Sequence, residues 1–203
     1  MLEESRDRPD GLRERKKART RASIREHALR LFRDQGYDAT TVEQIAAAAE
    51  VSPSTFFRYF PTKEDVVLRD DLDDRMFKAF ERQPPSLTPV AALRAAIREG
   101  IATLTPAEWE EFRGALALGH AVPEVRARMM DELTRTIEAA VDALAKRTGR
   151  PRDDLAVRVW AGAVFGVIMA VMGPHTYSEG NVDVQSFERI DEALALLEAG
   201  LPL

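Results

Sequence analysis

Cysteine is absent from this chain of 203 residues, and histidine occurs only three times. Without a thiol the chain has no disulfide, no thiolate metal site and no cysteine nucleophile. The histidines, His27, His120 and His175, are not spaced to share a metal ion, so we expect neither a metal site nor a cofactor. The sequence also has no nucleophile–base pair, glycine-rich phosphate loop or paired acid site, which argues against an enzyme.

Long apolar runs are missing as well. The longest, within residues 159–174, is short of the ~20 residues that a membrane-spanning helix needs. The charged N-terminus has no apolar stretch typical of a secretory signal. With 45% hydrophobic and 31% charged residues, the composition predicts a cytoplasmic globular protein of one domain or two small ones, without membrane contact.

The net charge of −5 is unevenly distributed along the chain. Residues 1–63 hold 13 Lys/Arg and 10 Asp/Glu, a net of +3, whereas residues 64–203 hold 16 and 24, a net of −8. Nine basic and only two acidic residues fall within 13–33. A local positive field is what binding to DNA phosphates requires. The alternative is a solvated, solubilising tail.

Two short helices joined by a tight turn are predicted between Thr40 and Lys63. Thr41 and Gln44 have the spacing of a capping box, which starts a helix near Val42. Ser52-Pro53 is the next start signal, a serine cap followed by a proline at the first helical position. A third capping pair, Thr62 with Asp65, predicts a helix that continues to about Arg82.

The second of these helices has two different faces. Phe56 and Phe60 share one face and are expected to point inward, while Ser54, Thr55 and Arg58 fall on the other. A short helix with an aromatic back and a hydrogen-bonding front fits a DNA major groove. Arg58 is the best candidate for a base reader, because its guanidinium fork matches the two acceptors of guanine.

Residues 24–67 resemble the DNA-binding domain of the TetR family of bacterial transcriptional regulators. The resemblance rests on ordered landmarks: Ala28, Leu31-Phe32, Gly36-Tyr37, Thr40-Thr41-Val42, Ile45-Ala46, Val51-Ser52, Thr55-Phe56, Tyr59-Phe60 and Lys63-Glu64. Two positions depart from the family pattern. Glu50 stands where many members have glycine, which predicts strain if the backbone is left-handed there. Phe57 stands where many have tyrosine, so a hydroxyl contact to phosphate is lost.

The helix faces and the family pattern together give the expected DNA contacts. They are Arg19, Arg21, Thr41, Glu43, Ser52, Ser54, Thr55, Phe57, Arg58, Tyr59 and Lys63. Lys63, Thr41 and a flexible basic arm over residues 1–18 are expected to position the phosphates, and the arm is followed by a helix-turn-helix domain over residues 19–65.

The remainder, residues 66–203, also reads as helices. Start signals at Thr88-Pro89, Thr105-Pro106, Pro123 and Asp153-Asp154 each open a helical pattern, and a loop over residues 174–183 leads to a last helix. The fold class is therefore all-α, with about nine helices: a three-helix DNA-binding domain and a helical domain for ligand binding and dimerisation. No convincing strand pattern and no internal repeat is present.

The last two helices, about residues 154–173 and 185–200, are the expected homodimer interface. The first is apolar almost all round and carries small residues at helical spacing, which let helices pack closely. The resemblance implies a four-helix interface between two copies here, and paired DNA half-sites require paired readers. The alternative is the central helix of a monomeric bundle.

A ligand pocket in the C-terminal domain is implied by the resemblance. Large apolar residues between the helices are the candidate lining, although plain core packing is the alternative for each: Phe77, Phe80, Trp109, Phe112, Leu116, His120, Met129, Met130, Leu133, Trp160, Phe165 and Met169. Residues 89–172 are similar to domains of the acyl-CoA-binding type. Phosphates of such a ligand would need cations, for which the candidates are Arg94, Arg98, Arg113, Arg126, Arg128 and Arg158.

Together these observations predict a ligand-responsive, DNA-binding transcriptional regulator. The resemblance favours a repressor that a small apolar effector, an acyl-CoA or another lipophilic molecule, releases from a palindromic operator. The alternative is a helical interaction module or enzyme in which the helix-turn-helix is only a scaffold.

Overall fold

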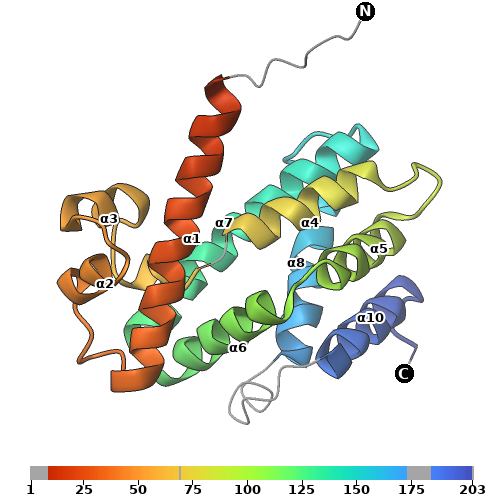
Figure 1. The fold of residues 1–203 in the computed structure, drawn as a ribbon. Coiled ribbons are helices and arrows are strands. Elements are labelled where there is room, and N and C mark those ends of the chain that lie inside the picture. Colours follow the sequence, from red (N-terminus) through yellow and green to blue (C-terminus); the bar gives the residue numbers. More distant parts are fainter. Residues whose placement is uncertain (1–8, 69, 173–183, 203) are drawn as a thin grey trace, which may run out of the picture. The chain divides into compact units, whose positions relative to one another are not determined.

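The structure is a computed structural model that describes residues 9–68, 70–172 and 184–202. The first eight residues of the expected arm and the expected loop over residues 174–183 lie outside these ranges. Within them the chain forms nine α-helices, one short 3-10 helix and no strand, which confirms the all-α prediction. The chain divides into two compact units, residues 1–67 and 68–203, which Figure 1 shows in red to orange and in yellow to blue.

The first unit consists of three α-helices and the 3-10 helix. These are α1 (Pro9–Gln35), α2 (Val42–Ala48), α3 (Pro53–Tyr59) and η1 (Glu64–Val66). Its core is formed by side chains that are almost completely buried: Ile24, Ala28, Phe32, Ile45, Ala46, Phe56, Phe60 and Val66. The helix α1 ends at Gly36, whose φ of 88° is readily adopted only by a residue without a Cβ.

The predicted capping signals are present as hydrogen bonds. The backbone N–H of Thr41 donates to Gln44 Oε1 at 2.9 Å, and the N–H of Gln44 donates to Thr41 Oγ1 at 3.3 Å. Ser52 Oγ accepts the N–H of Thr55 at 3.1 Å at the start of α3. These bonds satisfy backbone donors that the first turn of a helix leaves unpaired. The sequence therefore determined where α2 and α3 begin.

Two expectations for this part of the chain are corrected. Residues 9–18 lie in the expected arm, with the first helix expected to begin at about Arg13 or Thr20, but they belong to α1, which begins at Pro9. Helix-forming residues and a Lys17–Glu14 pair at 4.0 Å support the added turns. The single helix expected from Thr62 to Arg82 is instead broken into η1 and α4 (Asp70–Arg82). Val66, Val67 and Leu68 are all buried, and three successive buried positions do not fit a helix with one inner face.

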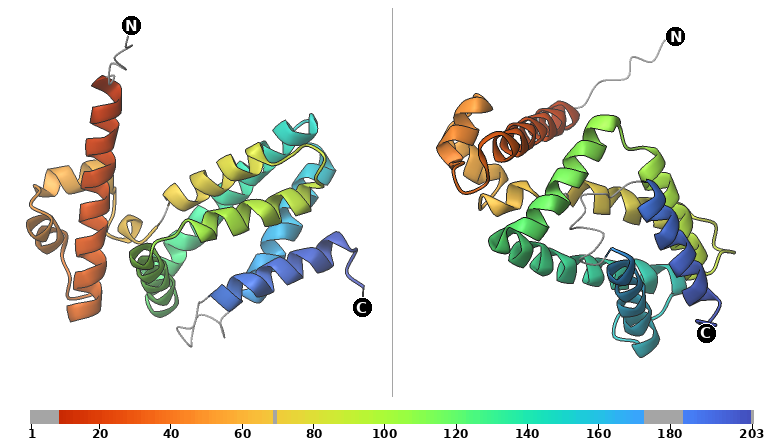
Figure 2. Two further views of the ribbon diagram at one scale, coloured as in Figure 1. Left: turned by 45° about the vertical axis from the view of Figure 1, so that its right-hand side comes forward. Right: turned by 90° about the horizontal axis from the view of Figure 1, so that it is seen from below.

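The second unit is a bundle of six described helices. In addition to α4 these are α5 (Pro89–Ala102), α6 (Pro106–Ala121), α7 (Pro123–Thr148), α8 (Leu155–Val171) and α10 (Val184–Glu198). The helix α4 packs against α5 and α7, and α8 packs against α7 and α10, as the views in Figure 2 show. None of the described helices is long and apolar enough to cross a membrane.

Arg147, near the end of α7, holds the end of α4 in place. Its guanidinium donates to four backbone carbonyls, at 3.4 Å to Phe80, 3.1 Å to Gln83, 2.6 Å to Pro84 and 3.2 Å to Leu87. It also lies 5.3 Å from the centre of the Phe80 ring. The last carbonyls of a helix carry partial negative charge, which a cation stabilises. One side chain thus joins α7, α4 and the link to α5.

Candidate nucleic-acid interface and effector domain

The helix α3 has the two faces that the sequence predicts. Phe56 and Phe60 are fully buried and their ring centroids lie 5.8 Å apart. Ser54 and Arg58 are exposed on the other side, and Thr55 is partly exposed. The buried rings hold α3 against the rest of the first unit, so the polar side of α3, here called the exposed polar row, faces solvent. This arrangement is suited to insertion into a major groove.

Three hydroxyl groups gather at the N-terminal end of α3. Ser52 Oγ lies 2.9 Å from Ser54 Oγ and 2.9 Å from Thr55 Oγ1. Hydroxyl groups both donate and accept, so the cluster offers adaptable partners for phosphate oxygens or base edges. Phe57 lies beside this row with half of its surface exposed, and its ring packs edge-on against Phe56 at 5.4 Å.

The guanidinium of Arg58 lies over a neighbouring aromatic ring. Its guanidinium carbon lies 5.4 Å from the centre of the Tyr59 ring. Stacking engages the flat face of a guanidinium and leaves its N–H edge directed outward. A guanidinium edge has the donor spacing that matches the O6 and N7 acceptors of guanine.

Lys63 is more tightly engaged than the sequence indicated. Its ammonium donates to the carbonyls of Tyr37 at 3.0 Å and Thr40 at 3.1 Å, and lies 3.8 Å from the centre of the Tyr37 ring. Two of its three N–H groups are therefore used in hydrogen bonds within the first unit. Tyr37 also donates to Glu64. Partial burial of the Glu64 carboxylate opposes its charged form. Hydrogen bonds from Tyr37 and Thr62 and the charge of Lys63 nevertheless hold the pKa of Glu64 below its ordinary value.

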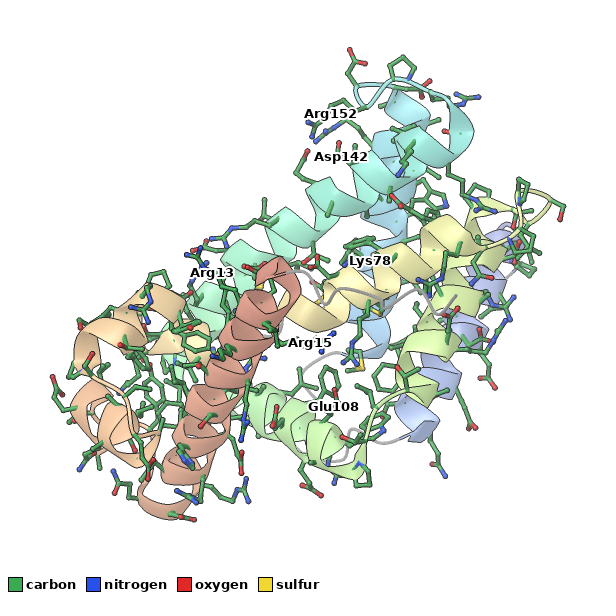
Figure 3. The ribbon with its side chains drawn as sticks, turned by 45° about the horizontal axis from the view of Figure 1, so that its top comes forward. Arg13, Arg15, Lys78, Glu108, Asp142 and Arg152 are labelled. Carbon is green, nitrogen blue, oxygen red and sulfur yellow. The ribbon has the colours of Figure 1, made fainter. Side chains whose placement is uncertain are left out.

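The remaining expected DNA contacts lie on α1 and α2. Arg19, Thr41 and Glu43 are exposed, while Arg21 is half-buried with its guanidinium carbon 5.0 Å from the centre of the Phe60 ring. Arg13 and Arg15 are exposed on the N-terminal half of α1 (Figure 3). The helical start of α1 thus carries basic side chains on a regular scaffold instead of a flexible chain.

Most of the expected effector-binding residues gather around two hydrophobic clusters in the second unit. Phe77, Phe80, Trp160 and Phe165 belong to or pack against the first. Leu116 belongs to the second, against which Phe112, Met129 and Trp160 pack. Trp109 joins them through an edge-on contact with Phe112 at 6.1 Å.

Three expected residues are placed differently. Met130, Met169 and His120 are exposed, because each lies on the outer side of its helix or at a helix end. Leu133 is partly buried on α7 and is not part of either cluster of described residues. Conversely, Phe187 on α10 was not among the candidates, yet its ring lies 5.4 Å from Trp109 and 5.9 Å from Phe112. Phe187, Ile190 and Leu194 are spaced three and four residues apart, which is typical of one apolar helix face but does not show which rings Phe187 contacts.

The arginines considered for a phosphate-bearing ligand have partners within the second unit. Arg94 binds Asp191 through two N–H groups, at 3.0 and 2.8 Å, and Arg98 binds the same carboxylate at 2.6 Å. Hydrogen bonds from Arg94 outweigh partial burial and hold the pKa of Asp191 below its ordinary value. Arg113 pairs with Glu110, Arg158 with Glu138 at 3.1 Å, and Arg126 donates to the carbonyls of Gly119 and His120.

The entrance to α6 shows the same pattern of internal pairing. Glu108, labelled in Figure 3, accepts the N–H of Thr105 at 2.8 Å in the predicted capping box. It also accepts from Arg75 of α4 at 3.0 Å. Among the described residues no group of three or more His, Cys, Asp or Glu could hold a metal ion.

The fold and the exposed polar row on α3 define a helix-turn-helix DNA-binding protein with a separate helical unit. Residues 24–69 match the family model described as "Bacterial regulatory proteins, tetR family", and residues 87–202 match the "MftR C-terminal domain" model. The chain belongs to the TetR family of transcriptional regulators, and it is a DNA-binding transcriptional regulator, not an enzyme.

Individual relatives agree with this assignment. The chain is 35% identical over 183 residues to the HTH-type transcriptional regulator TcmR of Streptomyces glaucescens, covering 87% of this chain and 81% of TcmR. Its fold is similar to that of SmeT, described as the repressor of a Stenotrophomonas maltophilia multidrug efflux pump, with a TM-score of 0.57, 21% identity and 89% of each chain covered. A TetR-family regulator from Streptomyces coelicolor has a TM-score of 0.56 and 18% identity, covering 90% of this chain and 99% of its own.

Proposed function

We propose that this protein is a homodimeric repressor that reads a palindromic operator through the exposed row of α3. The observation that carries this proposal is the combination of a fully buried aromatic back with Ser54 and Arg58 exposed on the same short helix. Arg58 is assigned to a base edge, and the hydroxyl cluster and the basic side chains of α1 are assigned to phosphates. Acting on chromosomal DNA places such a regulator in the bacterial cytoplasm.

The dimer is proposed to form through α8 and α10. One side of α8 carries exposed apolar or small residues at helical spacing, namely Leu155, Val159, Gly162, Gly166 and Met169. Leu155 is 75% and Val159 59% exposed, which is unusual for large apolar side chains on a regular helix. A Cβ added at Gly162 or Gly166 would meet nothing within 4 Å, so the helix backbone is open to close approach. A second copy would cover this surface.

Val159→Asp tests the dimer and the DNA function together. The side chain is exposed in the single chain, so the charge is expected to leave the fold intact and to prevent association. Light scattering after size exclusion should show a monomer, and affinity for an operator selected from random duplexes should fall at least tenfold. Ala117→Asp, at an exposed position of α6, is the matched control and should remain a dimer. Tight operator binding by a monomeric Val159→Asp would overturn the dimeric reading.

The effector is proposed to be a small apolar molecule that binds among the aromatic residues of the second unit. An acyl-CoA is the candidate that follows from the family resemblance. The internal pairing of Arg94, Arg98 and Arg158 favours a ligand without phosphates, because phosphates would have to compete with bound carboxylates. Fatty acyl-CoAs should be tested for release of operator DNA and for a shift in melting temperature. Absence of both effects would remove them from consideration.

A further inference from the structure

Trp160 on α8 has a buried hydrogen-bond donor without an acceptor. The indole Nε1 atom is shielded from solvent, and no residue in the described part of the chain accepts its hydrogen. Buried donors in proteins are almost always paired, because an unpaired one forfeits the hydrogen bond that it would make with water. A ligand that supplies an acceptor here gains more than it would at a donor already satisfied by the protein.

The Trp160 ring lies between the two hydrophobic clusters of the second unit. It packs against both hydrophobic clusters of the second unit, and its ring centroid lies 6.2 Å from that of Phe80. The cluster that contains Leu116 and Met172 also brings in Phe112 and Phe187, whose rings are 5.9 Å apart. Of the described residues Leu93 and Trp160, which pack on both clusters, only Trp160 carries a polar side-chain donor.

The aromatic side chains around it are incompletely covered. Of the seven described aromatic residues in the second unit only Phe80 is buried, and six keep part of their surface exposed: Phe77, Trp109, Phe112, Trp160, Phe165 and Phe187. In the smaller first unit Phe32, Tyr37, Phe56 and Phe60 are buried, whereas Phe57 and Tyr59 keep part of their surface exposed. A larger unit should bury its core more completely, not less. The partly exposed rings therefore leave apolar surface open to contact by a ligand or, on α8 and α10, by the second copy.

Charge selects the class of ligand. The guanidinium groups of Arg94 and Arg98 are held by Asp191, and Arg75 is bound to Glu108 at 3.0 Å. Near these three arginines of the described part of the unit, a carboxylate or phosphate would lose its hydration and would have to compete with Asp191 or Glu108 for a cation. An uncharged molecule with a carbonyl or ether oxygen meets the donor of Trp160 without that penalty.

We infer that Trp160 is the polar anchor of the effector site, and that its Nε1–H donates to an oxygen of an uncharged, largely aromatic ligand. This inference rests on the proposed effector response and adds the identity of the anchoring atom and the chemical class of the ligand. The aromatic rings supply apolar contact, and the single donor fixes the orientation of the ligand.

Two probes of matched shape test the anchor. 2-Acetylnaphthalene and 2-isopropylnaphthalene have the same number of heavy atoms and differ in one carbonyl oxygen. The wild-type protein should bind the ketone about five- to tenfold more tightly by calorimetry, the effect of one hydrogen bond to a previously unpaired donor. Trp160→Phe should reduce this ratio to about one. Trp109→Phe should weaken both probes alike and keep the ratio, and 2-naphthoate, an anion of similar shape, should bind less tightly than the ketone.

The indole N–H groups also give a direct signal. The chain has only two tryptophans, so ¹⁵N-labelled protein should show two indole cross-peaks, assigned by the two variants. The ketone should move the Trp160 peak downfield, and the hydrocarbon should not. The inference is overturned by equal binding of the two probes, by binding of neither, by a ratio that survives in Trp160→Phe, or by preference for the anion. Operator release is measured separately: a ketone that engages Trp160 without releasing DNA would contradict the proposed effector response and leave the anchor standing.

Discussion

Replacing Arg58 by alanine should relax the reading of one base pair. The guanidinium lies over the Tyr59 ring in the free protein, 5.4 Å from its centre. A bidentate contact to guanine is worth about 1–3 kcal/mol of discrimination against the wrong base. If the side chain leaves the ring to reach the groove, it gives up about 0.5–1 kcal/mol of cation–π attraction.

The difference between these terms gives the expected size of the effect. A net of about 0.5–2 kcal/mol corresponds to a loss of about 2- to 30-fold on the selected operator. The loss should vanish on operators whose guanine at the contacted position has been replaced, because the wild-type protein no longer gains the bidentate contact there. Arg58→Lys keeps the charge without the fork and should resemble alanine in specificity.

Fluorescence anisotropy on the operator and on scrambled duplexes, at several salt concentrations, measures the affinity of each variant and its specificity for the operator. Lys16→Ala, at an exposed position of α1, is the matched control for a phosphate contact. It should weaken binding to all sequences alike and lower the salt slope by about one. If Arg58→Ala produced that same uniform loss, Arg58 would be a phosphate ligand and the assignment to a base would be wrong.

Two further predictions concern stability. Glu50 has a φ of 55° in the turn before α3, a left-handed backbone that is strained for a residue with a Cβ. Glu50→Gly should therefore stabilise the protein by about 1 kcal/mol in chemical denaturation. Ala47→Gly inside α2 should destabilise it by a similar amount, and the reverse order of the two variants would contradict backbone strain at Glu50. Because the pKa of Asp191 is lowered in the folded state, its ion pair stabilises the protein above about pH 4 and this contribution is lost as the pH falls further. Asp191→Asn should therefore cost about 1–2 kcal/mol at pH 7 and little at pH 3, while Glu188→Gln on the same helix should change stability little at either pH.

The sequence was informative where local rules decide the structure. Thr41, Ser52 and Thr105 each cap a helix through residues three positions away, and such signals can be seen without knowing the fold. The buried aromatic face of α3 follows from the four-residue spacing of Phe56 and Phe60.

Contacts between distant parts of the chain could not be predicted in this way. The ammonium of Lys63 is held by the Tyr37 carbonyl, 26 positions earlier, and Arg94 is held by Asp191, 97 positions later. Nothing in the local pattern distinguishes these cations from solvated ones. The break before α4 likewise depends on burial from several sides, which a search for one apolar face does not detect.

Arg147 has a practical consequence for handling the protein. Ion pairs of the second unit such as Arg82–Glu99 at 2.6 Å and Lys146–Glu81 at 2.9 Å join an exposed cation to an exposed carboxylate. Dissolved salt screens the attraction within such pairs. Arg147 instead holds α4 through short contacts to neutral carbonyls, which salt screens much less. Concentrated salt should therefore strip nucleic acid from the basic first unit during purification while the junction of α4, α5 and α7 stays closed. Effector titrations on protein prepared in this way would start from an intact helical frame.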